Sequence, residues 1–255
     1  MKYFYRLIFI FSLLPLFSFG QIGYYPGYAV TLKNDTLRGY IDYKNWENNP
    51  RVISFKSEAQ GQSRKLTVQD IKHFSIDIGS LLEFERYEGP ISMDKTNIQQ
   101  LPSARDSVYQ QDTVFLKVMQ KGKNVVLYSY DDNLKTRFFI AGKPEFKPAE
   151  LTYRIYYNTN STGSADGRTV YENTYKKQLL ILSEQYNVLD EPLQILIGKS
   201  SYKDFELVAI CSKINGISEK DITKTNHEKK QTVKLVLAVL LFLLIAYGVF
   251  DKTVH

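Results

Sequence analysis

The chain has 255 residues and a formal net charge of +6, and 14% of its residues are aromatic. Its basic residues are scattered, without an arginine and lysine stripe interleaved with aromatics, so the composition argues against a nucleic-acid-binding protein. Nearly all of the aromatics are tyrosine and phenylalanine, which favour the half-buried surface of a sheet. The composition therefore predicts a mainly β fold with a core of its own.

The first 20 residues have the pattern of a secretory signal peptide. Lys2 and Arg6 precede the apolar stretch 7–17, and small residues occupy the −3 and −1 positions of a cleavage site that ends at Gly20. A buried N-terminal helix would show polar residues among the apolar ones, and residues 7–11 include none. The pattern predicts an exported protein whose net charge after cleavage is +4, because Lys2 and Arg6 leave with the signal.

Residues 21–157 are expected to form a β-rich extracytoplasmic domain of antiparallel hairpins and meanders. Alternating apolar and polar residues flank a turn cluster at 33–35, which predicts a hairpin. The polar segment 94–112 is expected to be a loop. Strands are predicted at 29–32, 36–43, 51–56, 81–87, 114–119, 124–130, 136–140 and 151–157, and a turn followed by a strand at 66–76.

Residues 158–216 are expected to be the helical C-terminal part of the same domain. The spacing of apolar residues predicts a helix over 173–186 and a short helical turn over 190–197. Ser201 and Asp204 form a capping-box pattern, which predicts a further helix that opens there and ends near Asn215 and Gly216.

The remaining residues predict a membrane anchor. The polar run 217–232 suits a tether, 233–250 is apolar on every side, and 251–255 would be a short cytoplasmic tail. Eighteen helical residues span about 27 Å, close to the roughly 30 Å of a hydrocarbon core. The predicted fold class is therefore mainly β, an antiparallel meander with hairpins, with C-terminal α-helices (α+β) plus one C-terminal transmembrane helix.

The orientation of this predicted helix involves a conflict. Three lysines, Lys229, Lys230 and Lys234, precede the helix and only Lys252 follows it, which by itself favours a cytoplasmic location for the residues before it. A translocating chain would instead meet the apolar helix as a stop-transfer segment. We therefore expect a single-pass inner-membrane protein with its main domain in the periplasm.

Several segments of the chain match one family pattern, and these are residues 27–30, 35–46, 53–56, 70–74, 122–130, 138–140 and 175–179. In them the sequence resembles the uncharacterised soluble N-terminal domain found ahead of outer-membrane β-barrels in Bacteroidota cell-envelope proteins. The resemblance covers residues 24–215 and implies an envelope location and a β-rich fold. It implies no active-site residue. The chain departs from the pattern because an apolar segment stands where a barrel would begin.

The sequence predicts no catalytic, cofactor-binding or metal-binding residues. The histidines His73, His227 and His255 are far apart, and no paired metal-ligand spacing, serine-nucleophile motif or phosphate-binding loop occurs. Glu83, Glu85 and Glu88 could place two carboxylates on one strand face, as glycosidases require, but their alternation with apolar residues is what any amphipathic strand shows.

Cys211 is the only cysteine, so an intramolecular disulfide is excluded. It lies in the apolar run 207–211, where a free cysteine behaves as a small core residue, and we expect it to be buried and unreactive.

These patterns predict a membrane-anchored extracytoplasmic interaction or scaffolding module of the bacterial cell envelope, without enzymatic activity. The alternatives are a transmembrane sensor and an envelope enzyme of unrecognised class. A sensor is disfavoured because residues 251–255 are too few for an output domain. Expected partners are the membrane, through a single-pass helix, and other envelope proteins. No small-molecule substrate can be identified.

Overall fold

A ten-stranded antiparallel sheet is the main element of the computed structural model, which describes residues 23–158 and 169–217. The strand order is β10-β9-β8-β7-β6-β5-β1-β2-β3-β4. Two meanders, β1 to β4 and β5 to β10, are thus joined by the pairing of β1 with β5. The strands are β1 (Tyr24–Thr31), β2 (Thr36–Asp42), β3 (Val52–Lys56), β4 (Arg64–Thr67), β5 (Ile71–Asp77), β6 (Leu81–Ser92), β7 (Tyr109–Lys121), β8 (Val125–Asp131), β9 (Thr136–Gly142) and β10 (Ala149–Glu150).

The predicted hairpin around residues 33–35 is confirmed. Strands β1 and β2 pair from Val30 opposite Thr36 onward. Asn34 adopts a φ of 73° in the turn, a left-handed conformation that asparagine tolerates better than most residues. The side chain of Thr31 accepts a hydrogen bond from the main-chain N–H of Asp35 at 3.1 Å, which closes the turn.

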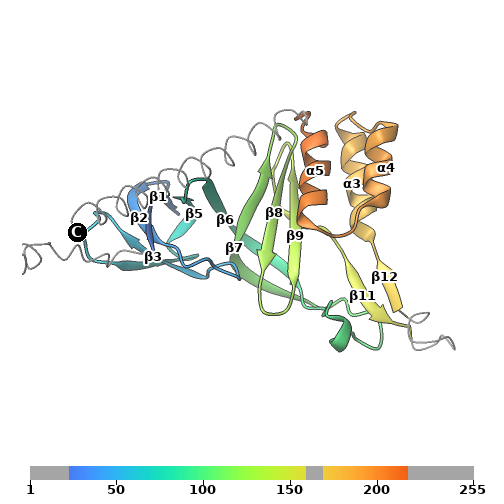
Figure 1. The fold of residues 1–255 in the computed structure, drawn as a ribbon, viewed down its shortest axis with the longest axis horizontal. Coiled ribbons are helices and arrows are strands. Elements are labelled where there is room, and N and C mark those ends of the chain that lie inside the picture. Colours follow the sequence, from blue (N-terminus) through green and yellow to red (C-terminus); the bar gives the residue numbers. More distant parts are fainter. Residues whose placement is uncertain (1–22, 159–168, 218–255) are drawn as a thin grey trace, which may run out of the picture.

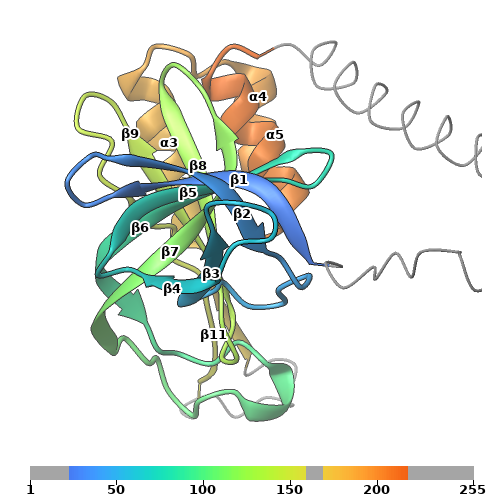
Figure 2. The same ribbon diagram turned by 90° about the vertical axis from the view of Figure 1, so that its left-hand side faces the viewer.

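The first strands curl over one another at one end of the molecule (Figures 1 and 2). Together with β5, β6 and β7 they enclose a core that is rich in phenylalanine. Phe74 stacks on Phe84 with 4.6 Å between ring centroids, and Phe115 meets Phe74 edge-on at 5.0 Å. Trp46, from the loop before β3, packs edge-on against both Phe74 and Phe84. Aromatic pairs in these geometries add about 0.5–1.5 kcal/mol each beyond their buried area.

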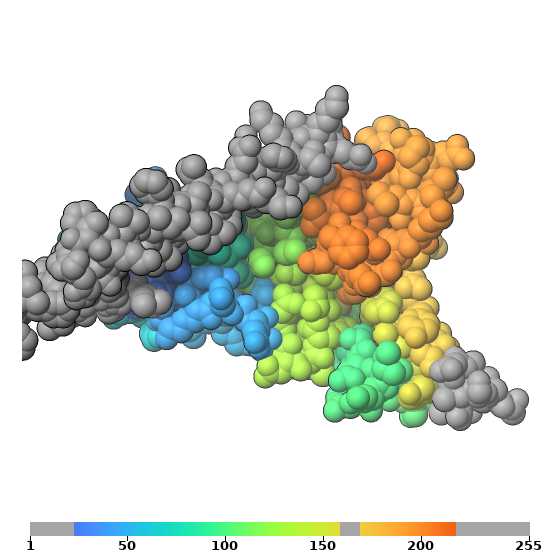
Figure 3. Space-filling model, in the orientation of Figure 1, coloured from blue at the N-terminus to red at the C-terminus, as the bar shows by residue number. Residues whose placement is uncertain are grey.

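Three helices cover one face of the sheet at the opposite end, against β7, β8 and β9 (Figure 1). They are α3 (Thr174–Gln185), α4 (Glu191–Lys199) and α5 (Asp204–Ile214). Side chains alternate between faces along a strand, so Val125 and Leu127 of β8 pack under the helices, whereas Tyr128 belongs to a separate core on the other face. Figure 3 shows the helices and these strands adjoining on one face of the molecule.

A second, two-stranded sheet pairs β11 (Arg154–Tyr157) with β12 (Thr169–Glu172). The loop between β6 and β7, which contains the short 3-10 helix η1 (Ile98–Gln100), lies beside it. The main-chain N–H of Tyr157 donates to the carbonyl of Pro102 at 2.9 Å. The guanidinium of Arg105 donates two hydrogen bonds to the carboxylate of Glu172, from Nε to Oε2 at 2.7 Å and from Nη2 to Oε1 at 2.9 Å.

The predicted fold class was wrong in one part. The described residues are mainly antiparallel β with three helices, but none of those helices is long and apolar enough to cross a membrane. The longest of the three, α3, has 12 residues, which at about 1.5 Å per residue span about 18 Å against about 30 Å of hydrocarbon. The predicted membrane span, 233–250, lies outside the described residues, as do the signal peptide, the tether and the predicted cytoplasmic tail.

Some element boundaries also differ from those expected. Helix α5 begins at Asp204 with Lys203 as its N-cap, so the capping box opening at Ser201 was wrong. The side chain of Glu206 instead accepts a hydrogen bond from the N–H of Ser201 at 2.6 Å. The predicted loop 94–112 is shorter, because β7 already begins at Tyr109 and continues the pairing with β6.

Candidate functional site

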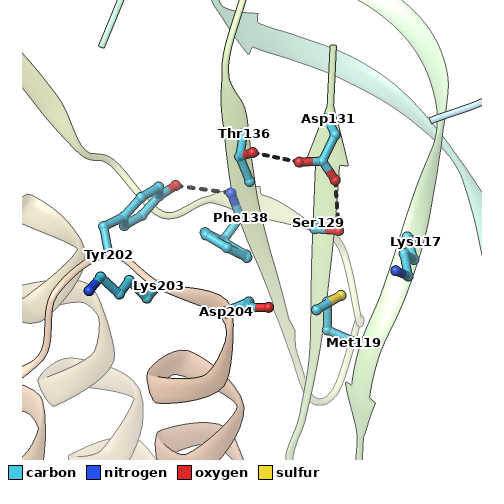
Figure 4. A pocket seen from close by; sticks show the side chains of 9 residues that line it. All are labelled: Lys117, Met119, Ser129, Asp131, Thr136, Phe138, Tyr202, Lys203 and Asp204. Carbon is cyan, nitrogen blue, oxygen red and sulfur yellow. Dashed lines mark hydrogen bonds between the residues drawn. The ribbon is translucent and has the colours of Figure 1, made fainter. Parts of the chain in front are cut away.

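A pocket of about 320 Å³ lies between the ends of three strands and the first turn of α5 (Figure 4). Its volume is at the lower end of the range of about 300–1,000 Å³ for small-molecule sites. Both charged and apolar side chains line it, which are Lys117, Met119, Ser129, Asp131, Thr136, Phe138, Tyr202, Lys203 and Asp204.

Strand register places the polar residues of the pocket beyond the region covered by helices. Ser129 and Asp131 follow Leu127 on the same face of β8, because side chains two residues apart share a face. Lys117 of β7 is the direct partner of Ser129, and Thr136 of β9 is the direct partner of Asp131. The apolar face of β8 that packs under the helices thus becomes polar at its last two residues on that face, Ser129 and Asp131.

The carboxylate of Asp131 is held by two hydroxyl groups. Its Oδ1 accepts a hydrogen bond from Thr136 Oγ1 at 2.5 Å, and its Oδ2 accepts one from Ser129 Oγ at 3.4 Å. Figure 4 shows the carboxylate between these two side chains. An acceptor fixed in this way needs little rearrangement to contact a ligand.

Asn49, from the loop before β3, fixes the strand end that carries Asp131. Its main-chain N–H donates to the carbonyl of Asp131 at 2.8 Å, and its Oδ1 accepts the N–H of Asp131 at 3.1 Å. Its Nδ2 donates to the carbonyls of Phe115 and Ser129 at 2.8 and 3.1 Å. The N-terminal half of the chain therefore holds one wall of the pocket.

Tyr202 forms an aromatic wall together with Phe138, and the two rings meet edge-on at 5.0 Å. The Tyr202 hydroxyl donates to the carbonyl of Leu151 at 2.7 Å and accepts the N–H of Phe138 at 2.9 Å. Burial raises the pKa of Tyr202 far above its ordinary value. The hydroxyl is therefore neutral and structurally engaged, which does not suit it to proton transfer.

The charged side chains of the pocket are not paired with one another. Lys117 and Lys203 supply positive charge, and Asp131 and Asp204 supply negative charge. Among the described residues, no ion pair within 4.0 Å involves any of these four. Figure 4 shows Asp131 and Asp204 on opposite sides of the pocket, on β8 and α5, with Lys117 on β7.

A second charged cluster lies inside the protein and ties the loop after β6 to β9 and β11. Asp94 is 1% exposed, and Lys135 Nζ lies 2.9 Å from its Oδ2. Arg154 lies 3.8 Å from the other oxygen of Asp94 and 3.0 Å from Glu172. Desolvation lowers the pKa of Lys135 despite the nearby Asp94 carboxylate. Because each charge in this cluster faces a charge of opposite sign, we assign the cluster a structural role in stabilising the fold.

The residues considered from the sequence as functional candidates lie outside the pocket, whereas Asp204, considered only for helix capping, lines it. His73 Nε2 is 3.2 Å from the Tyr28 hydroxyl, and burial lowers the pKa of His73. Glu85 accepts a hydrogen bond from Tyr128 at 2.7 Å. Cys211 is fully buried, and burial raises its pKa to about 12. The other two histidines lie outside the described residues.

Sequence patterns could not identify the pocket, because its residues come from three strands and the start of a helix, between positions 117 and 204. Within residues 23–158 and 169–217, no group of three or more His, Cys, Asp or Glu side chains could hold a metal ion. Comparison of the chain with protein-family models, curated proteins and solved structures gave no match.

Proposed function

We propose that this chain is an exported, non-catalytic binding module of the bacterial cell envelope that holds its partner at the pocket of Figure 4. The observation that carries the proposal is the set of unpaired charges of both signs around one cavity. Charged groups that face a cavity rather than each other are the polar anchors by which binding sites orient a partner. The signal-peptide pattern of residues 1–20 supports export.

The same residues favour binding over catalysis. The nine lining residues include neither histidine nor cysteine, the side chains that most often act as general base or nucleophile near neutral pH. Ser129 and Thr136 both donate to Asp131. For Asp131 to act as the base that activates one of these hydroxyls, a third group would have to orient its carboxylate. Tyr202 is already engaged through both donor and acceptor.

Site-directed photo-crosslinking in the native host tests this function. A photoreactive amino acid replaces Lys203, which is exposed at the pocket rim, in the full chain. We expect a defined adduct in the envelope fraction, and its yield should fall when Asp131→Asn is added. The matched control places the same group at Glu88, whose side chain is 67% exposed and lies on β6. Equal labelling at both positions, or recovery of the chain in the cytosol, would contradict the proposal.

A further inference from the structure

Two residues of the pocket are placed where an ion pair could form, yet they are unpaired. Lys117 lies directly across from Ser129, so Asp131 is its diagonal neighbour on β8. Diagonal neighbours in an antiparallel pair have Cα atoms about 7–8 Å apart, which is within reach of a lysine side chain. No contact within 4.0 Å joins them in the described structure. Asp131 is instead oriented by Thr136 and Ser129.

Asp204 adds a second carboxylate on the far side of the cavity. It is the first residue of α5, and its Oδ1 accepts the N–H of Phe205 at 2.7 Å, which leaves Oδ2 without a hydrogen bond among the described residues. Asp131 and Asp204 therefore flank the cavity with negative charge, while Lys117 supplies positive charge from β7 (Figure 4).

We infer that the pocket binds a zwitterionic amino-acid group, an amine and a carboxylate on the same carbon. This inference rests on the proposed binding function and specifies its ligand. The ligand amine would lie between Asp131 and Asp204, and the ligand carboxylate would lie against Lys117. Phe138 and Tyr202 would form the apolar wall beside the ligand carbon atoms.

Other ligand classes leave charges of the pocket unsatisfied. A simple amine would face Lys117, and a simple anion would face Asp131, and each like-charge contact opposes binding. An apolar ligand would desolvate four charged groups without compensation. Ca²⁺ and Mg²⁺ prefer six or more oxygen ligands and Zn²⁺ prefers four ligands that are mostly histidine or cysteine, whereas the described residues hold no cluster of three or more acidic, histidine or cysteine side chains.

The amino-acid group could be free or could be the end of a larger envelope molecule, and the test separates the two sources. The purified full chain is titrated by calorimetry with glycine, L-glutamate and γ-L-glutamylglycine, a peptide that retains a complete amino-acid end. Ethylamine, propionate and glycylglycine serve as probes in which one charge is absent or the two are far apart. We expect the first group to bind at least about tenfold more tightly than the second, a difference of about 1.4 kcal/mol.

The comparison within the first group identifies the source. Tighter binding of free glycine and L-glutamate than of γ-L-glutamylglycine indicates a free amino acid. Tighter binding of γ-L-glutamylglycine indicates the end of a larger molecule, and either result supports the zwitterion.

Variants of the pocket show whether both charges of the ligand are recognised. Lys117→Gln and Asp204→Asn should each weaken glycine binding about tenfold, whereas Glu88→Gln on β6 should not change it. Lys117→Gln should not weaken ethylamine binding, because that probe has no carboxylate. Asp204 is exposed, so its substitution tests the site without disturbing the core, and unchanged unfolding curves verify this.

The inference is wrong if no zwitterionic probe binds saturably, if ethylamine binds as tightly as glycine, or if Lys117→Gln leaves glycine binding unchanged. A crosslink from position 203 that persists under those outcomes would preserve the binding function and reject only its ligand. Loss of both the crosslink and the titration signal would reject the two together.

Discussion

Asn215 completes the main-chain hydrogen bonding of Val125 with its side-chain amide. Its Oδ1 accepts the N–H of Val125 at 2.9 Å, and its Nδ2 donates to the carbonyl of Val125 at 3.0 Å. The same Oδ1 accepts the N–H of Asn124, also at 2.9 Å. The residue that caps the C-terminus of α5 therefore acts as a short neighbouring strand for β8, whose other end carries Asp131.

Loss of this amide should destabilise the whole chain. Asn215 is 4% exposed, so Asn215→Ala removes the acceptor of the Val125 and Asn124 N–H groups, although the Val125 carbonyl keeps the N–H of Gly122 at 3.1 Å. The substitution should lower the free energy of unfolding by about 2–4 kcal/mol. Urea unfolding, followed by the fluorescence of the single tryptophan, Trp46, measures the change. Asn173→Ala is the control, since its amide makes one 3.5 Å bond on the surface, and a comparable loss in both variants would refute the assignment.

Gly122 should be intolerant of a side chain because of the same contact. A Cβ at this position would lie 2.1 Å from Asn215 Cγ, so Gly122→Ala should lower the free energy of unfolding by at least about 1–3 kcal/mol, the usual cost of overpacking. Gly198 lies in α4 with no atom within 4 Å of such a Cβ. Gly198→Ala should therefore stabilise the protein by about 0.5–1 kcal/mol. Thermal unfolding of both variants checks the opposite signs.

The buried Asp94 should matter far more than an exposed partner in an ion pair. Asp94→Asn removes the charge opposite Lys135 and Arg154 while keeping the shape, and it should cost about 3–5 kcal/mol, as expected for a broken buried pair. Glu88→Gln breaks the surface pair with Arg86 and should cost about 0–1 kcal/mol. Denaturant unfolding of the two variants tests this, and equal losses would show that the Asp94 cluster is not a desolvated ion network.

Cys211 should affect stability mainly at high pH. Its folded-state pKa of about 12 exceeds the ordinary value of about 8.5, so above pH 8.5 the unfolded chain releases a proton that the folded chain keeps. Its contribution to stability should then fall by about 1.4 kcal/mol per pH unit. Cys211→Ala, itself costing at most about 2 kcal/mol, should show a shallower decline between about pH 9 and 11. A native thiol that reacts rapidly with a disulfide reagent at pH 8 would contradict this.

Local patterns predicted the regular elements better than their ends. The strand predicted over residues 124–130 and the helix predicted from the spacing along 173–186 correspond closely to β8 and α3. Strands β4, β10 and β12 were missed, because they have only two to four residues each, too few to establish a period. The start of α5 was misplaced because Lys203, and not Ser201, is the N-cap of the helix, while Glu206 accepts a hydrogen bond from the N–H of Ser201.

The pocket depends on information that no short segment contains. Lys117 and Ser129 become neighbours only when β7 and β8 pair in one register, and a slip of one residue would reverse the faces. The contact of Asn49 with Asp131 joins positions 82 apart in the sequence. Such a pairing is decided by the packing of the whole sheet, so the sequence predicted a binding protein without indicating its site.

The place of β1 between β2 and β5 has a consequence for how the chain is made. In the proposed export, the chain emerges from the membrane N-terminus first, so β1 can pair with β2 soon after both have emerged. Its other edge stays open until residues 71–77 emerge as β5. An unpaired strand edge can recruit a strand from a neighbouring molecule. The interval between the emergence of β2 and the emergence of β5 is therefore a period in which the chain can aggregate and in which a holding chaperone would be effective.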